Sequence, residues 1–327
     1  MNAKIRWGIV GPGKIARKFC EDLATHPDAE MVAVGSRNLA RAQQFAAEFN
    51  ISKSYDSYDT LFSDSNVEVV YIATPHRFHH ELSLKAMENG KHVLCEKPLG
   101  VNAKEVRELI ESARKNKVFL MEGLWTRFNP SIEKIINDLK QQRIGKVHYV
   151  LADFAFNAMD RDLDSRLWNP ELASGSLLDI GIYPIFLSYL VLGMPEKIQA
   201  MSTFHENGTE IQTAMQFQYP NAMACLYSGF SSTSKMEAEI SGSKGQILIQ
   251  PRWHETSSYR IEEDGLETLV ETPPKGGGFT EEIEEVHSCL RRQAKESEKW
   301  SLQHSLDLVT LLDSVREKVG LRFPFEV

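Results

Sequence analysis

A glycine-rich turn near the N-terminus constrains the fold more than any other feature of this 327-residue chain. It reads GPGKIA (residues 11–16) and lies between a compact apolar run, IRWGIVG (residues 5–11), and a stretch with apolar side chains four residues apart (residues 15–26). The run predicts a buried strand, and the four-residue spacing predicts a helix. A strand, a glycine turn and a helix in this order open a βαβ unit whose turn binds the diphosphate of a dinucleotide.

Each position of the turn has a physical role in such a unit. Gly11 permits the tight turn, Gly13 lets the diphosphate approach the backbone, and Ala16 keeps the helix close to the sheet. Lys14 and Ile15 begin the helix, where free N–H groups and a partial positive charge favour an anion. A glycine turn that binds nothing is the alternative, and the strand–turn–helix context argues against it.

Strand and helix patterns continue to alternate over the first third of the chain. Further strands are predicted at residues 30–36, 67–73, 91–95 and 118–121. Helices between them are predicted at residues 39–49, 79–89 and 102–116. Because such alternation implies right-handed crossovers and a doubly wound parallel sheet, we expect an α/β fold with a Rossmann domain over residues 1–122.

The pattern changes after residue 122. Short β-like runs are predicted at residues 147–156, 197–204, 211–218, 222–230, 236–241, 246–250 and 258–263. Helical stretches interrupt them at residues 131–142, 183–192, 280–296 and 301–319. We therefore expect a C-terminal α+β domain, residues 123–327, with a large, mainly antiparallel sheet and helices on one face.

Composition excludes several classes of partner. The net charge of −8 argues against nucleic acid, which would require a basic face. The apolar runs fall short of the ~20 residues that span a bilayer, so no membrane partner is expected. The four cysteines are scattered, which indicates reduced thiols in a cytoplasmic protein. Three nearby histidines, His76, His79 and His80, have no cysteine or carboxylate set at zinc spacing, so no metal site is expected.

The end of the second predicted strand indicates which dinucleotide binds. An acidic residue there would bind the ribose hydroxyls of NAD. The chain instead has Ser36 and Arg37, with Arg41 one turn into the next helix. A hydroxyl and a guanidinium suit a 2′-phosphate, so NADP(H) is favoured and NAD(H) stays possible. The alternative is that Arg37 is a solvated loop residue.

Three further segments follow predicted strands, at the sheet edge where ligands of such folds gather. They are residues 73–79, 95–98 and 121–127. The residues in them that we expect to contact the cofactor are Thr74, Pro75, His76, His79, Glu96, Lys97, Trp125 and Arg127. For His79, the two interpretations are a position beside the nicotinamide and a position on the loop that shapes it.

With these segments in place, the chain resembles a known family over nearly its whole length. The GPGKIA turn, Thr74-Pro75 with His79, Glu96-Lys97-Pro98, and Asp179-x-x-x-Tyr183 occur in this order in the Gfo/Idh/MocA oxidoreductases. Trp125-Thr126-Arg127-Phe128 and the tyrosine at 183 are most similar to the branch containing dihydrodiol dehydrogenase and NADP-dependent D-xylose dehydrogenase. One departure is Ser174-Gly175-Ser176, where many members are richer in glycine.

The resemblance implies an activity and an assembly. It implies a Rossmann domain, an open-sheet C-terminal domain that often forms homodimers, and redox chemistry between an alcohol and a carbonyl group. It also implies that Lys97, Asp179 and Tyr183 form the catalytic group.

The same residues suit this chemistry in their own right. Hydride transfer at a carbinol carbon needs a partner for the hydroxyl proton. Tyr183 can serve if a nearby cation such as Lys97 lowers its pKa, and the sequence does not decide which of the two transfers the proton. Asp179 would share a helical face with Tyr183, although Pro184 leaves the start of that helix open.

Each of these residues also has a plainer interpretation. Lys97 can be an exposed turn residue, Asp179 a helix cap and Tyr183 a core aromatic. Arg166 and Trp168 are expected to line the substrate pocket with Lys97, Trp125, Asp179 and Tyr183, against the alternatives of a surface arginine and a core tryptophan.

The sequence thus predicts a dehydrogenase or reductase for a sugar, a cyclic polyol or a vicinal diol. The alternative is a non-catalytic sensor that binds NADP(H) or a sugar on the same fold, since fold alone does not secure catalysis.

Overall fold

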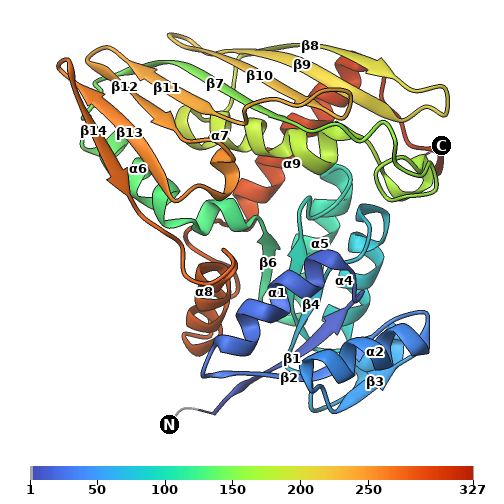
Figure 1. Ribbon diagram of the computed structural model, residues 1–327. Coiled ribbons are helices and arrows are strands. Elements are labelled where there is room, and N and C mark those ends of the chain that lie inside the picture. The colour runs from blue at the N-terminus through green and yellow to red at the C-terminus, as the bar shows by residue number, and fades with distance from the viewer. Residues whose placement is uncertain (1–2, 327) are drawn as a thin grey trace. The chain divides into compact units, whose positions relative to one another are not determined.

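The computed structural model describes residues 3–326 (Figure 1). The chain forms two compact units. The first consists of Met1–Trp125 and Lys275–Leu306, and the second of Thr126–Pro274 and Asp307–Val327.

The first unit contains a six-stranded sheet in the order β3-β2-β1-β4-β5-β6, with every pair parallel. Its strands are β1 (Ile5–Val10), β2 (Ala29–Gly35), β3 (Lys53–Tyr55), β4 (Val69–Ile72), β5 (His92–Glu96) and β6 (Leu120–Gly123). The residues of β4, VVYI, are all buried, as expected for a central strand covered on both faces. This arrangement confirms the predicted doubly wound Rossmann sheet.

The first unit also contains the helices that connect these strands, and a later one, α8, that does not connect them. They are α1 (Lys14–Thr25), α2 (Leu39–Phe49), α3 (Tyr58–Ser63), α4 (His79–Glu88), α5 (Ala103–Asn116) and α8 (Thr280–Arg291). Helix α5 shows why the sequence folds this way: the Asn102 side chain accepts a hydrogen bond from Glu105 N at its start, and Lys117 ends it in a left-handed conformation. The short elements β3 and α3 were not predicted from the sequence.

The segment from Lys275 to Leu306 differs from the expected domain division, which assigned it to the C-terminal domain. Polar contacts attach it to the first unit instead. The carboxylate of Asp22 on α1 accepts hydrogen bonds from Gly277 N (2.6 Å) and Phe279 N (2.7 Å), which fixes the glycine-rich loop before α8. Farther along, Trp300 Nε1 donates to Glu122 Oε2 at the end of β6 (3.0 Å).

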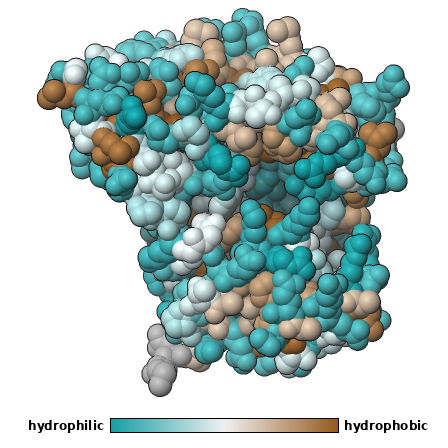
Figure 2. Space-filling model, in the orientation of Figure 1, coloured by the Kyte–Doolittle hydropathy of each residue, from teal (hydrophilic) through white to brown (hydrophobic). Residues whose placement is uncertain are grey.

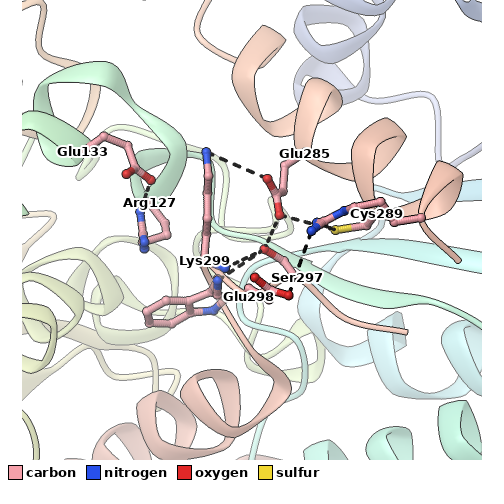
Figure 3. A network of polar contacts seen from close by, with 9 residues as sticks. Arg127, Glu133, Glu285, Cys289, Ser297, Glu298 and Lys299 are labelled. Carbon is pink, nitrogen blue, oxygen red and sulfur yellow. Dashed lines mark hydrogen bonds and ion pairs between the residues drawn. The ribbon is translucent and has the colours of Figure 1, made fainter. Parts of the chain in front are cut away.

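A polar network around Glu285 connects α8 to the chain that follows it (Figure 3). Glu285 Oε1 accepts from the Ser297 hydroxyl at 2.7 Å, and Lys299 Nζ lies 3.8 Å from its other oxygen. The Cys289 thiol also contacts Glu285, and burial raises the pKa of that thiol to about 11. Helix α8 and the residues up to Lys299 are therefore joined by these polar contacts.

The second unit contains an eight-stranded sheet in the order β14-β13-β12-β11-β7-β10-β9-β8. Its strands are β7 (Val147–Ala155), β8 (Lys197–Phe204), β9 (Glu210–Gln218), β10 (Met223–Gly229), β11 (Ala238–Gly242), β12 (Gly245–Ile249), β13 (Ser258–Glu263) and β14 (Leu266–Glu271). All neighbours are antiparallel except β7 and β10, which are parallel. The predicted large, mainly antiparallel sheet is confirmed, with β14 as an additional strand.

Helices cover one face of this sheet and leave the other uncovered (Figure 1). Helices α6 (Pro130–Lys140) and α7 (Ile182–Leu192) belong to the second unit, and α9 (Leu302–Val319) ends in it. Helix α7 packs on β7 and β10. The strands accordingly alternate between buried and exposed residues, as β9 does along most of its length.

One helical stretch, Pro170–Leu192, is apolar and long enough to span a membrane by length and composition alone. However, 78% of its most apolar window is buried inside the structure, which is typical of a core helix. The face of the molecule in Figure 2 is mostly hydrophilic, with apolar side chains in separate patches.

Candidate functional site

The glycine turn follows β1 in a conformation that only glycine adopts easily. Gly11 has a φ of +86°, and its N–H donates to the Gly35 carbonyl at 3.2 Å. A Cβ at Gly11 would lie 2.8 Å from Thr74 Cγ2 and 3.2 Å from the Ala73 carbonyl. The turn is therefore held tightly between the ends of β2 and β4.

The space beside Gly13 is open, in contrast. Among residues 3–326, a Cβ there would meet only the Gly11 carbonyl oxygen, 4.0 Å away. Helix α1 begins at this point with no side-chain cap and no acidic residue in its first turn, while Lys14 and Ile15 are exposed and Ala16 is fully buried. Uncapped N–H groups at an open helix N-terminus suit a phosphate group.

Thr74 adds a second indication of a bound polar group. Its hydroxyl is buried and has no hydrogen-bond partner among residues 3–326. Pro75 follows in extended conformation and begins the 3₁₀ turn His76–Phe78. Since buried hydroxyls almost always have a partner, an unpartnered one beside the glycine turn fits a site completed by a ligand oxygen. The residues present thus fit a dinucleotide.

The residues expected at the ribose follow β2. The Ser36 hydroxyl oxygen accepts a hydrogen bond from Asn38 N at 3.2 Å, and Ser36 is 7% exposed. The Arg37 guanidinium lies over the Phe78 ring, 5.1 Å from its centroid, so Arg37 is exposed but stacked on the loop after β4. Arg41 is exposed on the first turn of α2, whose start is capped by Asn38.

His79 is the first residue of α4, and its imidazole ring is held between two backbone carbonyl groups. It is fully buried, its Nδ1 is 2.8 Å from the Pro98 carbonyl oxygen and its Nε2 is 2.8 Å from the Thr74 carbonyl oxygen. Burial lowers the pKa of this imidazole, the two carbonyls oppose that shift, and Lys97 adds to it. His79 therefore connects the loops after β4 and β5, and the ring of His76, 9% exposed, lies 5.7 Å away.

Glu96 and Lys97 lie at the end of β5. Glu96 is buried and accepts a hydrogen bond from the Tyr71 hydroxyl. Lys97 is partly exposed, and its peptide bond to Pro98 is cis. Lys97 is thus carried by a buried strand end but keeps access to solvent.

Sequence reasoning did not assign a role to Glu122, at the end of β6. Its carboxylate is 2% exposed and accepts from Leu99 N (2.9 Å) and Trp300 Nε1 (3.0 Å). Burial raises its pKa, and these donors and the Lys97 charge oppose that shift. Glu122 therefore holds the loop that follows Lys97.

Trp125 makes an aromatic stack and Arg127 an ion pair with other residues of the chain. Trp125, in the first unit, stacks on Phe279 with ring centroids 4.8 Å apart. Arg127, in the second unit, is 7% exposed and pairs with Glu133 at 2.5 Å (Figure 3). Their contact with a cofactor stays a prediction.

In the second unit, Asp179 and Tyr183 lie on one continuous helical segment. A π-helical turn, Leu177–Gly181, leads directly into α7, so Pro184 does not separate the two residues. Asp179 is 6% exposed, lies within the π-helical turn and accepts from Arg166 Nη1 at 2.8 Å, and the residues at the two N-cap positions, Ser176 and Gly181, make no side-chain cap hydrogen bond. The plainer interpretation of Asp179 as a helix cap is therefore not what the structure shows.

Tyr183 is 5% exposed and lies in an aromatic group that the sequence did not reveal. Its ring centroid is 5.6 Å from that of Phe154 and 5.4 Å from that of His254, and these two rings stack on each other at 4.1 Å. Tyr183 is therefore a packed aromatic on the same helical segment as Asp179, and its catalytic role stays a prediction.

Arg166 and Trp168 differ in burial and in their contacts. The Arg166 side chain is 57% exposed and binds Asp179. Trp168 is 1% exposed, and its Nε1 donates to the Ala158 carbonyl at 2.9 Å, which fits the core alternative. Within residues 3–326, no group of three or more His, Cys, Asp or Glu residues is arranged to hold a metal ion.

Two family models match the chain. One describes the NAD-binding Rossmann fold of an oxidoreductase family, GFO_IDH_MocA, and matches residues 5–124. The other describes the GFO/IDH/MocA C-terminal domain and matches residues 132–248.

Two mammalian proteins named as dehydrogenases are similar to this chain over nearly its whole length. A mouse trans-1,2-dihydrobenzene-1,2-diol dehydrogenase is 39% identical, and a human protein of the same name is 37% identical, each match covering 98% of both chains. Among solved structures, KijD10, a 3-ketoreductase from Actinomadura kijaniata in complex with NADP and TDP-benzene, superposes with a TM-score of 0.88 at 25% identity, covering 97% of this chain and 98% of that one.

Proposed function

This chain belongs to the GFO/IDH/MocA family of oxidoreductases, and on that premise we propose that it is an NADP(H)-dependent dehydrogenase or reductase of a sugar, a cyclic polyol or a vicinal diol. The family resemblance inferred from the order of the motifs is confirmed, as is the prediction of an enzyme. The observation that carries the proposal is the open, uncapped start of α1 at Gly13 beside the unpartnered Thr74 hydroxyl, with Lys97 at the end of a strand of the same sheet.

The preference for NADP(H) is supported by the residues after β2. Ser36 and Arg37 stand where a carboxylate would select NAD, and Arg37 is already held over Phe78. Arg41 adds a positive charge one helical turn away. The solved relative that binds NADP supports the same choice.

The substrate class is supported by the names of the relatives, which act on a dihydrodiol and, as a 3-ketoreductase, on a ketone. When bound, the cofactor supplies or accepts the hydride. Tyr183 and Lys97 are the two groups that we assign to the hydroxyl proton. Asp179 is assigned the orientation of the substrate hydroxyl, because its carboxylate is held by Arg166 in one direction.

The test is turnover of a panel of aldoses, inositols, dihydrodiols and dicarbonyls with NADPH or NADP⁺, and then with the NAD couple. Tyr183→Phe and Lys97→Met should each lower kcat by ~10²- to 10⁴-fold while NADPH still binds, because general acid–base catalysis contributes about that factor. Wild-type turnover in both variants would contradict the assigned mechanism. No turnover on any substrate, with tight NADPH binding, would favour a sensor.

We also propose that the chain forms a homodimer through the uncovered face of its large sheet. Leu151 on β7 (41% exposed), Met223 on β10 (47%) and Met201 on β8 (78%) are exposed on that face, an apolar surface that a second copy would bury. Met201→Glu should convert a dimer to a monomer in light scattering, and a monomeric wild-type chain would contradict the proposal.

A cytoplasmic location is proposed on the free thiols of all four cysteines. Microscopy of the tagged chain tests it, and an exported protein would contradict it.

A further inference from the structure

Glu210, the first residue of β9, is a fully buried carboxylate that none of the roles above uses. Its oxygens accept hydrogen bonds from Leu177 N (2.7 Å), the Ser176 hydroxyl (2.8 Å) and the Thr213 hydroxyl (2.6 Å). Burial raises the pKa of Glu210, and these donors oppose that shift. The chain thus keeps a costly group in the core of the second unit and surrounds it with donors.

The donors show what Glu210 holds. Ser176 and Leu177 begin the helical segment that continues to Leu192, and the first N–H groups of a helix have no partner within it. A carboxylate at this end satisfies them and favours the helix dipole. Glu210 therefore acts as a helix cap supplied by a different strand.

The packing around this cap is close. Gly175 has a φ of +117°, and a Cβ there would lie 3.1 Å from Glu210 Oε2 and 3.2 Å from the Glu210 carbonyl oxygen. On the other side, a Cβ at Gly181 would lie 2.8 Å from the Ser228 hydroxyl, which itself contacts the Ser176 hydroxyl at 3.0 Å. Both ends of the π-helical turn are thus fixed against the sheet, and the serine at 176 takes part in fixing it.

Thr209, the residue before Glu210, contacts the chain segment that carries Arg166, the partner of Asp179 in the ion pair. The Thr209 hydroxyl donates to the Trp168 carbonyl oxygen at 2.7 Å, two residues from Arg166. Thr209 and Glu210, adjacent in sequence, therefore contact both chain segments that carry this pair.

We propose that Glu210 is a positioning residue for the chemistry proposed above: by holding the N–H of Leu177 and the hydroxyl of Ser176, it sets the place of Asp179 and Tyr183 on their helical segment. This inference rests on the proposed function. A shift of about 1 Å in a reacting group can lower turnover by ~10²-fold, so a cap that fixes the segment has a measurable effect on kcat.

The experiment compares Glu210→Ala with Glu210→Gln and with a matched control, Asp138→Ala. The glutamine amide keeps an acceptor for the Leu177 N–H, and the two hydroxyls can turn to accept from its NH₂ group. Asp138, on α6, is also fully buried in the second unit and accepts from Tyr259, Lys134 and Arg143. None of these contacts involves the segment that carries Asp179 and Tyr183.

Two readouts are measured: steady-state kinetics on a substrate that the wild type turns over, and hydrogen exchange of the peptide spanning residues 177–183. Glu210→Ala should lower kcat by roughly ten- to a hundredfold relative to Asp138→Ala, leave NADPH affinity unchanged, and speed exchange of the peptide. Glu210→Gln should keep kcat and exchange near wild type. Equal kcat and exchange in the two alanine variants would overturn the inference.

If Glu210→Ala does not fold, Ser176→Ala replaces it. A lower kcat and faster exchange than in Asp138→Ala would then support the inference, and values equal to the control would overturn it. If the wild type turns over no substrate, the proposed function fails, while the exchange comparison still decides whether Glu210 orders the segment.

Discussion

Lowering the pH from 7.5 to 5 should remove stability from the first unit through one buried histidine. His287 on α8 is 1% exposed, and its Nε2 accepts a hydrogen bond from Trp7 Nε1 at 3.0 Å. The ring of His26 lies 4.2 Å from its centroid. Burial, with smaller contributions from His26 and Arg291, lowers the pKa of His287 from 6.5 to about 4.

The sign and size of the effect follow from this shift. Below pH 6.5 the unfolded chain takes up a proton at this position that the folded chain does not, so the contribution to stability is complete above pH 6.5 and is lost as the pH falls toward 4. At 1.36 kcal/mol per pKa unit, the shift of about 2.5 units corresponds to ~3 kcal/mol in total, of which about 2 kcal/mol is lost by pH 5.

The assay is urea unfolding of the wild type and of His287→Gln at several pH values, followed by tryptophan fluorescence. Glutamine keeps an acceptor for the Trp7 indole but does not titrate. Other histidines with lowered pKa, such as His79 and His92, affect the wild type and the variant equally. The difference between their free energies of unfolding therefore reports on His287 alone.

The advantage of the wild type over His287→Gln should shrink by about 2 kcal/mol between pH 7.5 and 5. A constant difference would refute the reasoning, and so would an imidazole pKa above 6 in an NMR titration of His287.

Two further predictions concern single positions in the first unit. Gly11→Ala should destabilise the fold by ~1–3 kcal/mol, because the positive φ of Gly11 and its contact with Thr74 both disfavour a side chain. Gly13→Ala should keep the melting temperature of the wild type and weaken NADPH binding, because the space beside Gly13 is open. Melting curves and NADPH titration test this contrast, and equal melting temperatures of the two variants would refute it. Glu282 is fully buried, and its carboxylate has no hydrogen-bond partner within residues 3–326. Burial raises the pKa of Glu282 well above the ordinary value. Its contribution to stability is therefore lost as the pH rises above about 4.5, where the unfolded chain releases the proton. Glu282→Met should therefore raise the free energy of unfolding at pH 7.5 by ~1–3 kcal/mol, and an unchanged or lower value would count against this account.

Periodicity and turn chemistry were sufficient to predict the parallel sheet, since its strands are apolar runs and its turns contain glycine. The roles of Gly11 and Gly13 follow from local backbone geometry, which a short motif encodes. The short strand β3 has three residues and no apolar run, so no pattern marks it.

The parts that were missed depend on contacts between distant residues. Glu210 lies 33 residues from Leu177 and occupies the start of a strand with alternating burial, where a charged residue is ordinarily exposed. Nothing local distinguishes it from a solvated glutamate. The aromatic neighbours of Tyr183 come from β7 and from residue 254 for the same reason. Pro184 indicated an interrupted helix, but the π-helical turn before it keeps the segment continuous.

The return of the chain at Lys275 into the first unit bears on how the protein folds during synthesis. When the ribosome has made residue 125, the residues of all six parallel strands have been synthesised, but the partners of Asp22 and Glu122, which are backbone and indole N–H groups of residues 277–300, have not. At 5–20 residues per second, Trp300 emerges roughly 10–35 s later. For that interval the nucleotide-binding sheet exists with part of its covering missing. A truncated gene ending near residue 125 would encode a permanently incomplete unit, prone to aggregation.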